Sequence, residues 1–153
     1  MKLIQSFRYA FAGLWYCIRR ERNFRIHLCA AALVLLTGYF AGFDGRDFAT
    51  LLVTISLVLF AEIANTAIER TVDLFSPEYN LVAKYAKDLA AGAVLVCALL
   101  SIGTACALFL SGDSWGTLWN SFGQLPWLAP VYAVLLLLCV LFVVFGGKRD
   151  GDW

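Results

Sequence analysis

The sequence predicts an all-α integral membrane protein, with an N-terminal interfacial amphipathic helix followed by four transmembrane helices. Of its 153 residues, 61% are hydrophobic and only 15% are charged, whereas soluble domains carry about a quarter charged residues. Four apolar segments follow a first segment that mixes aromatic and basic residues. The chain therefore has too little polar surface to cover itself in water, and its length accommodates one domain.

The first 25 residues predict a helix that lies in the membrane interface. They mix basic with aromatic residues, and they contain no continuous apolar core or small-residue cleavage site. The aromatic side chains of such a helix dip into the membrane while its cations face lipid headgroups. This segment is therefore not expected to be a cleavable signal peptide.

The first two apolar segments reach spanning length when their neighbours are included. A bilayer core of about 30 Å needs roughly 20 helical residues. Residues 28–43 reach that length with Ile26 and His27. Residues 48–61 reach it because their helical pattern continues to about Phe75. A polar turn between the two segments separates the expected helices.

The last two apolar segments predict a third span and an additional fourth. Residues 89–112 are long enough unaided. Pro126 and Pro130 interrupt the last segment, so the fourth span is expected at 127–145, after an outer loop at 111–125. We accordingly divide the chain into residues 1–111, with the interfacial helix and three spans, and residues 112–153, with the outer loop, the extra helix and a short cytoplasmic tail.

The distribution of basic residues predicts the orientation. Of the 12 Lys and Arg residues, all except Arg46 lie before the first span, between the second and third, or after the fourth. Positive residues concentrate on the cytoplasmic side of membrane proteins. Both termini are therefore expected in the cytoplasm, which agrees with an even number of spans.

Several classes of function are disfavoured. The net charge of +1 argues against a nucleic-acid partner. The five cysteines form no C-x-x-C pair, so neither a disulfide framework nor a zinc site is expected. The sequence contains no phosphate-binding P-loop, no protein-kinase catalytic loop and no H-x-x-x-H zinc motif.

The strongest chemical signal is an acidic stripe near the end of the second span. At about 100° per residue, Glu69 and Asp73 fall within about 20° of Glu62, and Asn65 lies some 60° away. Carboxylates near hydrocarbon are costly and repel one another unless a cation or a proton intervenes. Oxygen ligands on one stripe suggest that these acids share a Mg²⁺ ion. The alternative is a solvated helix end whose carboxylates pair with arginines, here Arg25 and Arg70.

Two further groups of polar residues flank the spans. Lys87 and Asp88 precede the third span, where the lysine either extends to lipid headgroups or holds phosphate oxygens while Asp88 orients it. Ser76 and Pro77 predict a helix start, with Ser76 as N-cap and Pro77 at the first helical position. Free N–H groups at such a start would favour an anion.

Glu21 and His27 lie at the joint between the interfacial helix and the first span. Glu21 stands among arginines, so pairing with them is its simplest structural role. His27 is the one histidine of the sequence. A lone histidine at a span boundary is more often a hydrogen-bonded structural residue than a ligand.

These motifs resemble the prokaryotic diacylglycerol kinase family, small membrane enzymes that include the undecaprenol kinases. The resemblance covers about residues 6–110. It rests on the pattern E-x-x-N-[ST]-A-I-E-x-x-V-D at residues 62–73, on Lys87-Asp88 downstream, and on residues 21–27. The residues around Asn23 and Asn65 look like the Gram-positive branch, which resembles undecaprenol kinases.

The resemblance implies roles for the matching residues. Glu62 is expected to be the general base for a lipid hydroxyl. Glu21 and Glu69 are expected to bind the Mg²⁺ that accompanies ATP, with Asn65 supporting them. Lys87 is expected to contact the transferring phosphates, held by Asp88. The remaining residues expected to bind the nucleotide complex are Tyr9, Asp73, Glu78, Tyr79 and Asn80.

The resemblance also implies an activity and an assembly. We expect ATP-dependent phosphorylation of a membrane lipid alcohol, with undecaprenol favoured over diacylglycerol, by a homotrimer whose active sites are shared between subunits. The chain departs from the family after residue 110, and Asn80 replaces a common histidine. From the residues alone, a four-span proton-coupled transporter using Glu62 and a structural or regulatory membrane subunit remain alternatives.

Overall fold

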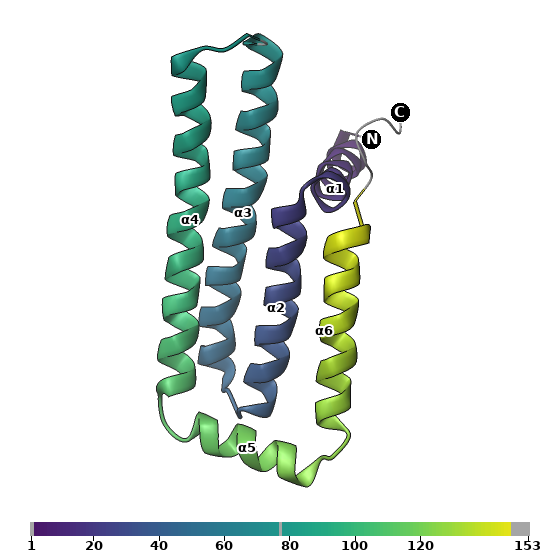
Figure 1. Cartoon of the computed structure of the whole chain (residues 1–153), viewed down its shortest axis with the longest axis vertical. Coiled ribbons are helices and arrows are strands. Elements are labelled where there is room, and N and C mark those ends of the chain that lie inside the picture. The colour runs from purple at the N-terminus through teal and green to yellow at the C-terminus, as the bar shows by residue number, and fades with distance from the viewer. Residues whose placement is uncertain (1, 77, 148–153) are drawn as a thin grey trace.

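The computed structural model describes residues 2–76 and 78–147, which form helices and no strands. In chain order the helices are α1 (Lys2–Arg20), α2 (Arg22–Phe40), α3 (Gly45–Phe75), α4 (Leu81–Leu110), α5 (Ser114–Gln124) and α6 (Leu128–Phe145). Figure 1 shows α4, α3, α2 and α6 as upright helices, with α5 across one end and α1 at the other end of α2. These four upright helices are long and apolar enough to cross a membrane, which confirms the predicted fold class.

The break between α1 and α2 falls at Glu21, whose backbone is extended. The interfacial helix therefore ends at Arg20 and the first span begins at Arg22, earlier than the position near Ile26 that the sequence suggested. Most apolar side chains of α1, among them Phe7 and Phe11, are exposed, as expected for a helix that rests on a membrane.

A tight turn and a capping box start α3. Gly42 adopts a φ of 77°, which favours glycine, and a Cβ atom there would lie 3.3 Å from Cγ2 of Thr117 in α5. The Asp44 carboxylate accepts hydrogen bonds from the backbone N–H groups of Arg46 and Asp47, while the Asp47 side chain accepts from the N–H of Asp44. This reciprocal arrangement satisfies donors at the helix start that have no partner inside the helix.

The predicted helix start at Ser76 and Pro77 is wrong. Ser76 instead follows the end of α3, where its N–H donates to the Val72 carbonyl. Asn80 is the N-cap of α4, and its side chain accepts from Val82 and Ala83. Pro77 lies outside the described residues. Both Ser and Asn are good N-caps, so local sequence alone did not separate the two positions.

The predicted outer loop at 111–125 is largely helical. The helix α5 buries Leu118 against Ala41, Phe43 and Leu51, and it covers the end of the bundle. Ser121 donates to the Phe40 carbonyl at 3.0 Å, which ties α5 to the end of α2. The prediction of a loop is therefore wrong for residues 114–124, where packing against the bundle stabilises a short helix.

The additional last helix packs beside α2 (Figure 1). Its start at Leu128 confirms the span predicted at about 127–145. Tyr132 donates to the Thr37 hydroxyl at 3.1 Å, and the Cys29 thiol lies 3.9 Å from the Cys139 carbonyl. Lys148 and Arg149, which entered the orientation argument, lie outside the described residues.

Candidate active site

Glu62 lies buried in the helix bundle and contacts the first span. Its residue is 3% exposed, and its Oε1 lies 3.1 Å from Nε2 of His27 in α2. Because a buried carboxylate without a partner is costly, the imidazole N–H is the group that makes this position tolerable. The charges of Glu21 and Glu69 also act on Glu62, which places three predicted site residues in one electrostatic environment.

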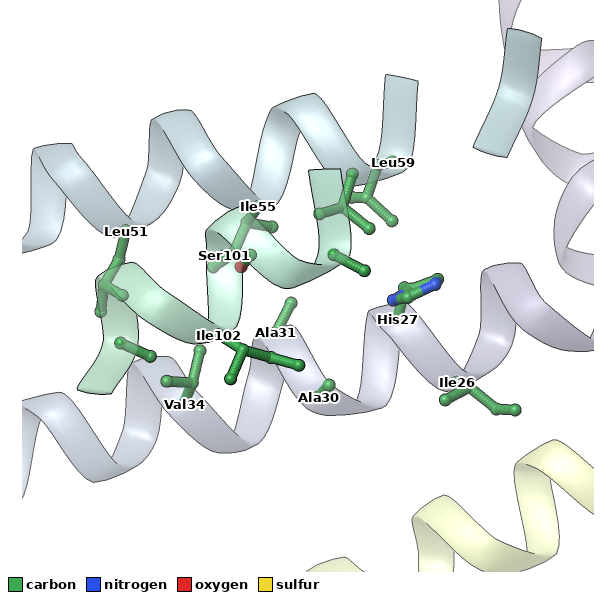
Figure 2. A pocket seen from close by; sticks show the side chains of 13 residues that line it. Ile26, His27, Ala30, Ala31, Val34, Leu51, Ile55, Leu59, Ser101 and Ile102 are labelled. Atoms are coloured by element: carbon green, nitrogen blue, oxygen red, sulfur yellow. The ribbon is translucent and has the colours of Figure 1, made fainter. Parts of the chain in front are cut away.

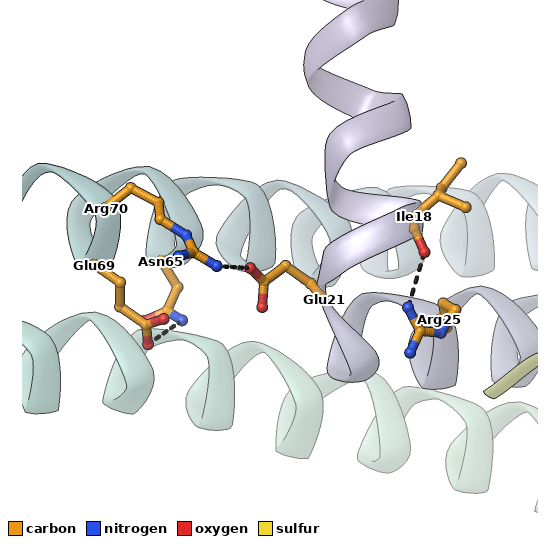
Figure 3. Close-up of polar contacts among 6 residues, drawn as sticks. All are labelled: Ile18, Glu21, Arg25, Asn65, Glu69 and Arg70. Atoms are coloured by element: carbon orange, nitrogen blue, oxygen red, sulfur yellow. Dashed lines mark hydrogen bonds and ion pairs between the residues drawn. The ribbon is translucent and has the colours of Figure 1, made fainter. Parts of the chain in front are cut away.

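Glu21 reaches α3 from the joint between α1 and α2. Its Oε1 accepts from Nη2 of Arg70 at 3.3 Å (Figure 3), and Arg70 also lies over the Tyr16 ring. The sequence predicted pairing of Glu21 with the arginines that neighbour it in the chain, whereas the observed partner is Arg70 of α3. The Arg70 side chain is largely exposed, so this pair stabilises the joint only slightly.

Asn65 and Glu69 form the second pair on α3. Asn65 Nδ2 donates to Glu69 Oε1 at 2.9 Å (Figure 3). Asn65 Oδ1 is left buried without a hydrogen-bond partner in the described part of the chain. An unpartnered buried amide oxygen beside a carboxylate fits the hard oxygen ligands that Mg²⁺ prefers.

The acidic stripe does not converge on one point. Glu62 and Asp73 are eleven residues apart, which is about 16 Å along a helix. Asp73 pairs with Lys87 of α4 instead. Among residues 2–76 and 78–147, no three His, Cys, Asp or Glu side chains gather closely enough to hold one metal ion. The expectation that the stripe shares a single ion is therefore wrong, and within one chain the acids divide between two places.

Lys87 lies near the start of α4, away from Glu62. Its ammonium contacts Asp73 rather than Asp88, which is exposed. The expected orientation of Lys87 by Asp88 is thus replaced by a pair across the α3–α4 hairpin.

The remaining nucleotide-binding candidates lie on exposed surfaces. Tyr79 is 83% exposed, and Glu78 lies beside it in the α3–α4 connection. Asn80 Oδ1 is engaged in the cap of α4. Tyr9 is exposed on α1, with the Arg8 guanidinium over its ring. One chain does not bring these residues together with Glu62.

An apolar groove runs between α2, α3 and α4 and ends at His27. Its volume is about 330 Å³. Figure 2 shows Leu51 toward one end of the lining and His27 toward the other. Among the lining side chains only His27 and Ser101 are polar. The groove therefore suits a hydrocarbon chain whose polar end reaches the neighbourhood of Glu62.

Sequence reasoning missed this groove and the contact of His27. Small residues on facing helices are the signal that was available, with Ala30 and Ala31 on α2 and Ala98 and Ala105 on α4. Small side chains leave room between helices, but their pairing depends on the tertiary structure.

Comparison with known proteins places this arrangement in a family. Residues 8–109 match the family model of prokaryotic diacylglycerol kinase. This range contains all of α2 and α3 and most of α1 and α4. The chain belongs to the prokaryotic diacylglycerol kinase family. In this family member, Glu62, Asn65, Glu69 and Lys87 all lie inside the matched range, whereas α5 and α6 lie beyond it.

Individual relatives carry two different names. An undecaprenol kinase of Bacillus subtilis is 38% identical over 109 residues, which is 71% of this chain and 89% of that protein. A diacylglycerol kinase of Synechocystis is 40% identical over 71% of this chain and 62% of that protein. A diacylglycerol kinase of Escherichia coli is 30% identical over 80% and 93%. No solved structure matches this family member significantly.

Proposed function

We propose that this chain is an ATP-dependent lipid kinase that phosphorylates the hydroxyl of a membrane lipid alcohol, with undecaprenol as the preferred substrate. One observation carries the proposal: the buried Glu62 is hydrogen-bonded to His27, which closes an apolar groove between three spans. A lipid chain in that groove brings its hydroxyl to a carboxylate in an environment that excludes most water. The names of the relatives support the same activity.

In the proposed reaction, the hydroxyl oxygen of the lipid attacks the γ-phosphorus of ATP while Glu62 accepts the hydroxyl proton. The bond between that phosphorus and the β–γ bridging oxygen breaks, and ADP leaves. Such transfers depend on positioning and charge neutralisation more than on covalent chemistry. His27 lines the groove and contacts the Glu62 carboxylate, so the position of the base is fixed before the substrate arrives.

The residues that would hold Mg²⁺ are Glu21 and Glu69, with the Oδ1 of Asn65 beside them. When bound, the ion neutralises charge on the phosphate oxygens of ATP. Magnesium keeps several waters and uses few protein carboxylates when it binds with substrate phosphates. Two acids and an unpartnered amide oxygen fit that pattern.

The composition of the groove favours undecaprenol over diacylglycerol. A polyprenol has a single polar group at one end, whereas diacylglycerol carries two ester groups close to its hydroxyl. Apart from His27 and Ser101, the groove offers only hydrocarbon side chains, so the esters would lose hydration without gaining partners. Diacylglycerol remains the alternative substrate because most of the named relatives act on it.

We place the protein in the bacterial cell membrane with both termini in the cytoplasm, where ATP is available. We further propose a homotrimer with active sites shared between subunits. In a single chain, Lys87 and Tyr79 lie on the α3–α4 hairpin, apart from Glu62. A neighbouring subunit that presents its hairpin to the groove would bring nucleotide and lipid together.

The deciding experiment is an assay of the full chain in detergent micelles with Mg²⁺ and radiolabelled ATP, offering undecaprenol and diacylglycerol side by side. Faster labelling of undecaprenol is the expected result. Faster labelling of diacylglycerol would preserve the reaction and overturn the substrate. No product from either lipid with folded protein, together with proton flux in liposomes without ATP, would favour a transporter that uses Glu62.

A further inference from the structure

The Arg25 side chain binds the C-terminal ends of two helices at once. Its Nη1 donates to the Ile18 carbonyl in α1 at 3.0 Å (Figure 3), and its Nη2 donates to the Val143 carbonyl in α6 at 3.3 Å. In each helix the acceptor is the third residue from the end. These carbonyls lack partners within their own helices, and helix C-termini favour cations.

This arginine is buried although it is charged. Arg25 is 5% exposed, and its two hydrogen bonds go to main-chain oxygens. The guanidinium is a planar, rigid fork whose N–H groups point in fixed and different directions, whereas a lysine ammonium acts as a point charge on a flexible chain. The guanidinium therefore connects α6 to the turn of α1 that directly precedes Glu21.

We infer that Arg25 is a positioning residue through which the additional helix α6 holds the last turn of α1, and with it Glu21, in place. The fourth span, which lies outside the range that matches the family, thus supports the site. Loss of the contact between Arg25 and α6 loosens the α1–α2 joint while leaving Glu62, His27 and Asn65 intact. The link to Glu21 as a magnesium ligand rests on the proposed function.

A substitution at Gly147 would disrupt the contact between Arg25 and α6 without changing Arg25 itself. A Cβ atom at Gly147 would lie 2.8 Å from Arg25 Nη2 and 3.0 Å from Nη1. Because the guanidinium ends a flexible side chain, Gly147→Val displaces it with little strain on the backbone. Gly123→Val is the matched control, since a Cβ there has no neighbour within 4 Å. Arg25→Lys is a second, independent variant.

The reaction rate of the Cys17 thiol measures how firmly the last turn of α1 is held, and this measurement does not depend on kinase activity. Cys17 is 4% exposed and precedes Ile18. Because the residue is buried, a reagent in solution reaches the thiol slowly in the folded protein. With the other four cysteines replaced by alanine, we expect Gly147→Val and Arg25→Lys to speed the reaction of Cys17 with N-ethylmaleimide by roughly fivefold. Gly123→Val should leave the rate unchanged.

The kinetic measurement is the Mg²⁺ concentration that gives half-maximal velocity. We expect this concentration to rise roughly fivefold in Gly147→Val and to stay unchanged in Gly123→Val. Unchanged thiol rates in both test variants overturn the inference. Faster thiol reaction with an unchanged Mg²⁺ requirement overturns the link to the site. A wild-type chain without kinase activity contradicts the proposed function instead, and the thiol rates then decide the inference alone.

Discussion

The side chain of Glu62 combines deep burial with a single polar contact among residues 2–76 and 78–147. Its neighbours on α3 are mostly apolar, and the hydrogen bond from His27 is the contact that compensates its loss of hydration. A carboxylate in this state suits proton transfer, since little water competes for its free oxygen. Two predictions concern this pair.

Glu62→Gln should lower kcat by about 10²- to 10⁴-fold, because general-base assistance contributes that much. The amide preserves the shape of the side chain, so the affinity for ATP should stay close to that of the wild type. Calorimetric titration with a non-hydrolysable ATP analogue measures that affinity. The control is Asp113→Asn, near the opposite end of the bundle. Retained turnover in Glu62→Gln would remove the general-base assignment.

His27→Gln and His27→Leu should differ in activity. Glutamine offers an N–H at a position similar to Nε2, whereas leucine leaves the buried carboxylate without a donor. We expect His27→Gln to keep kcat within a few-fold and His27→Leu to lower it at least about tenfold, with the KM for ATP unchanged in both. Equal losses in the two variants would instead indicate that the imidazole serves packing alone.

The sequence predicted the residues of this site better than their contacts. Helical periodicity placed Glu62, Asn65 and Glu69 along α3, because local spacing determines which side chains share a helix face. The hydrogen bond between His27 and Glu62 joins different helices and has no local pattern. For the same reason, the pairing of Asp73 with Lys87 was not foreseen.

At the scale of elements, the groove between α2, α3 and α4 depends on small residues. Ala31→Phe should fill much of it and raise the KM for undecaprenol about tenfold, while a short, water-soluble prenol should be affected less. Steady-state assays with both substrates measure the difference. Ala133→Phe, on an exposed face of α6, is the control. Equal effects on long and short prenols would contradict a chain-binding role for the groove.

The N-terminal cap of α3 makes stability depend on pH. Hydrogen bonds from the N–H groups of Asp47 and Arg46 lower the pKa of Asp44. The stabilisation is therefore present above the ordinary carboxyl pKa and is lost as the pH falls through the lowered value. Asp44→Ala should reduce Tm by a few degrees at neutral pH and by much less in strong acid.

Thermal unfolding in detergent at both pH values tests this prediction. Asp113→Ala is the control, because Asp113 precedes α5 without making a side-chain cap bond. A Tm difference for Asp44→Ala that persists in strong acid would show that the carboxylate contributes by other means.

The long apolar helices were predictable from the sequence, whereas the short helix α5 was not. Composition and length identified all four spans, because the bilayer imposes both on a helix. The helix α5 was missed because its eleven residues gain stability by packing Leu118 into the bundle, which is a tertiary effect. The cap of α4 was misplaced because the local sequence contains two good candidates.

For the whole molecule, a shared active site predicts recovery of activity between two inactive variants. In a trimer mixed equally from Glu62→Gln and Lys87→Met subunits, a site between neighbours has both intact residues with a probability of about one quarter. Mixing in detergent followed by reconstitution should therefore restore about a quarter of wild-type activity. No recovery would place the whole site within one subunit. The sequence of one chain predicts the members of such a site, but contacts between copies determine its geometry.

The length of α3 has a consequence for how the rate depends on substrate supply. Its 31 residues extend about 46 Å, while a bilayer core measures about 30 Å. Glu69 and Asp73 lie in the last two turns of the helix, and Glu62 lies about 20 Å before its end. In the proposed reaction, transfer therefore takes place near the membrane boundary, where the lipid arrives by diffusion in two dimensions and the nucleotide in three. The velocity then follows the mole fraction of the lipid alcohol within the bilayer. Adding inert lipid slows the reaction, whereas adding more vesicles of the same composition does not speed it.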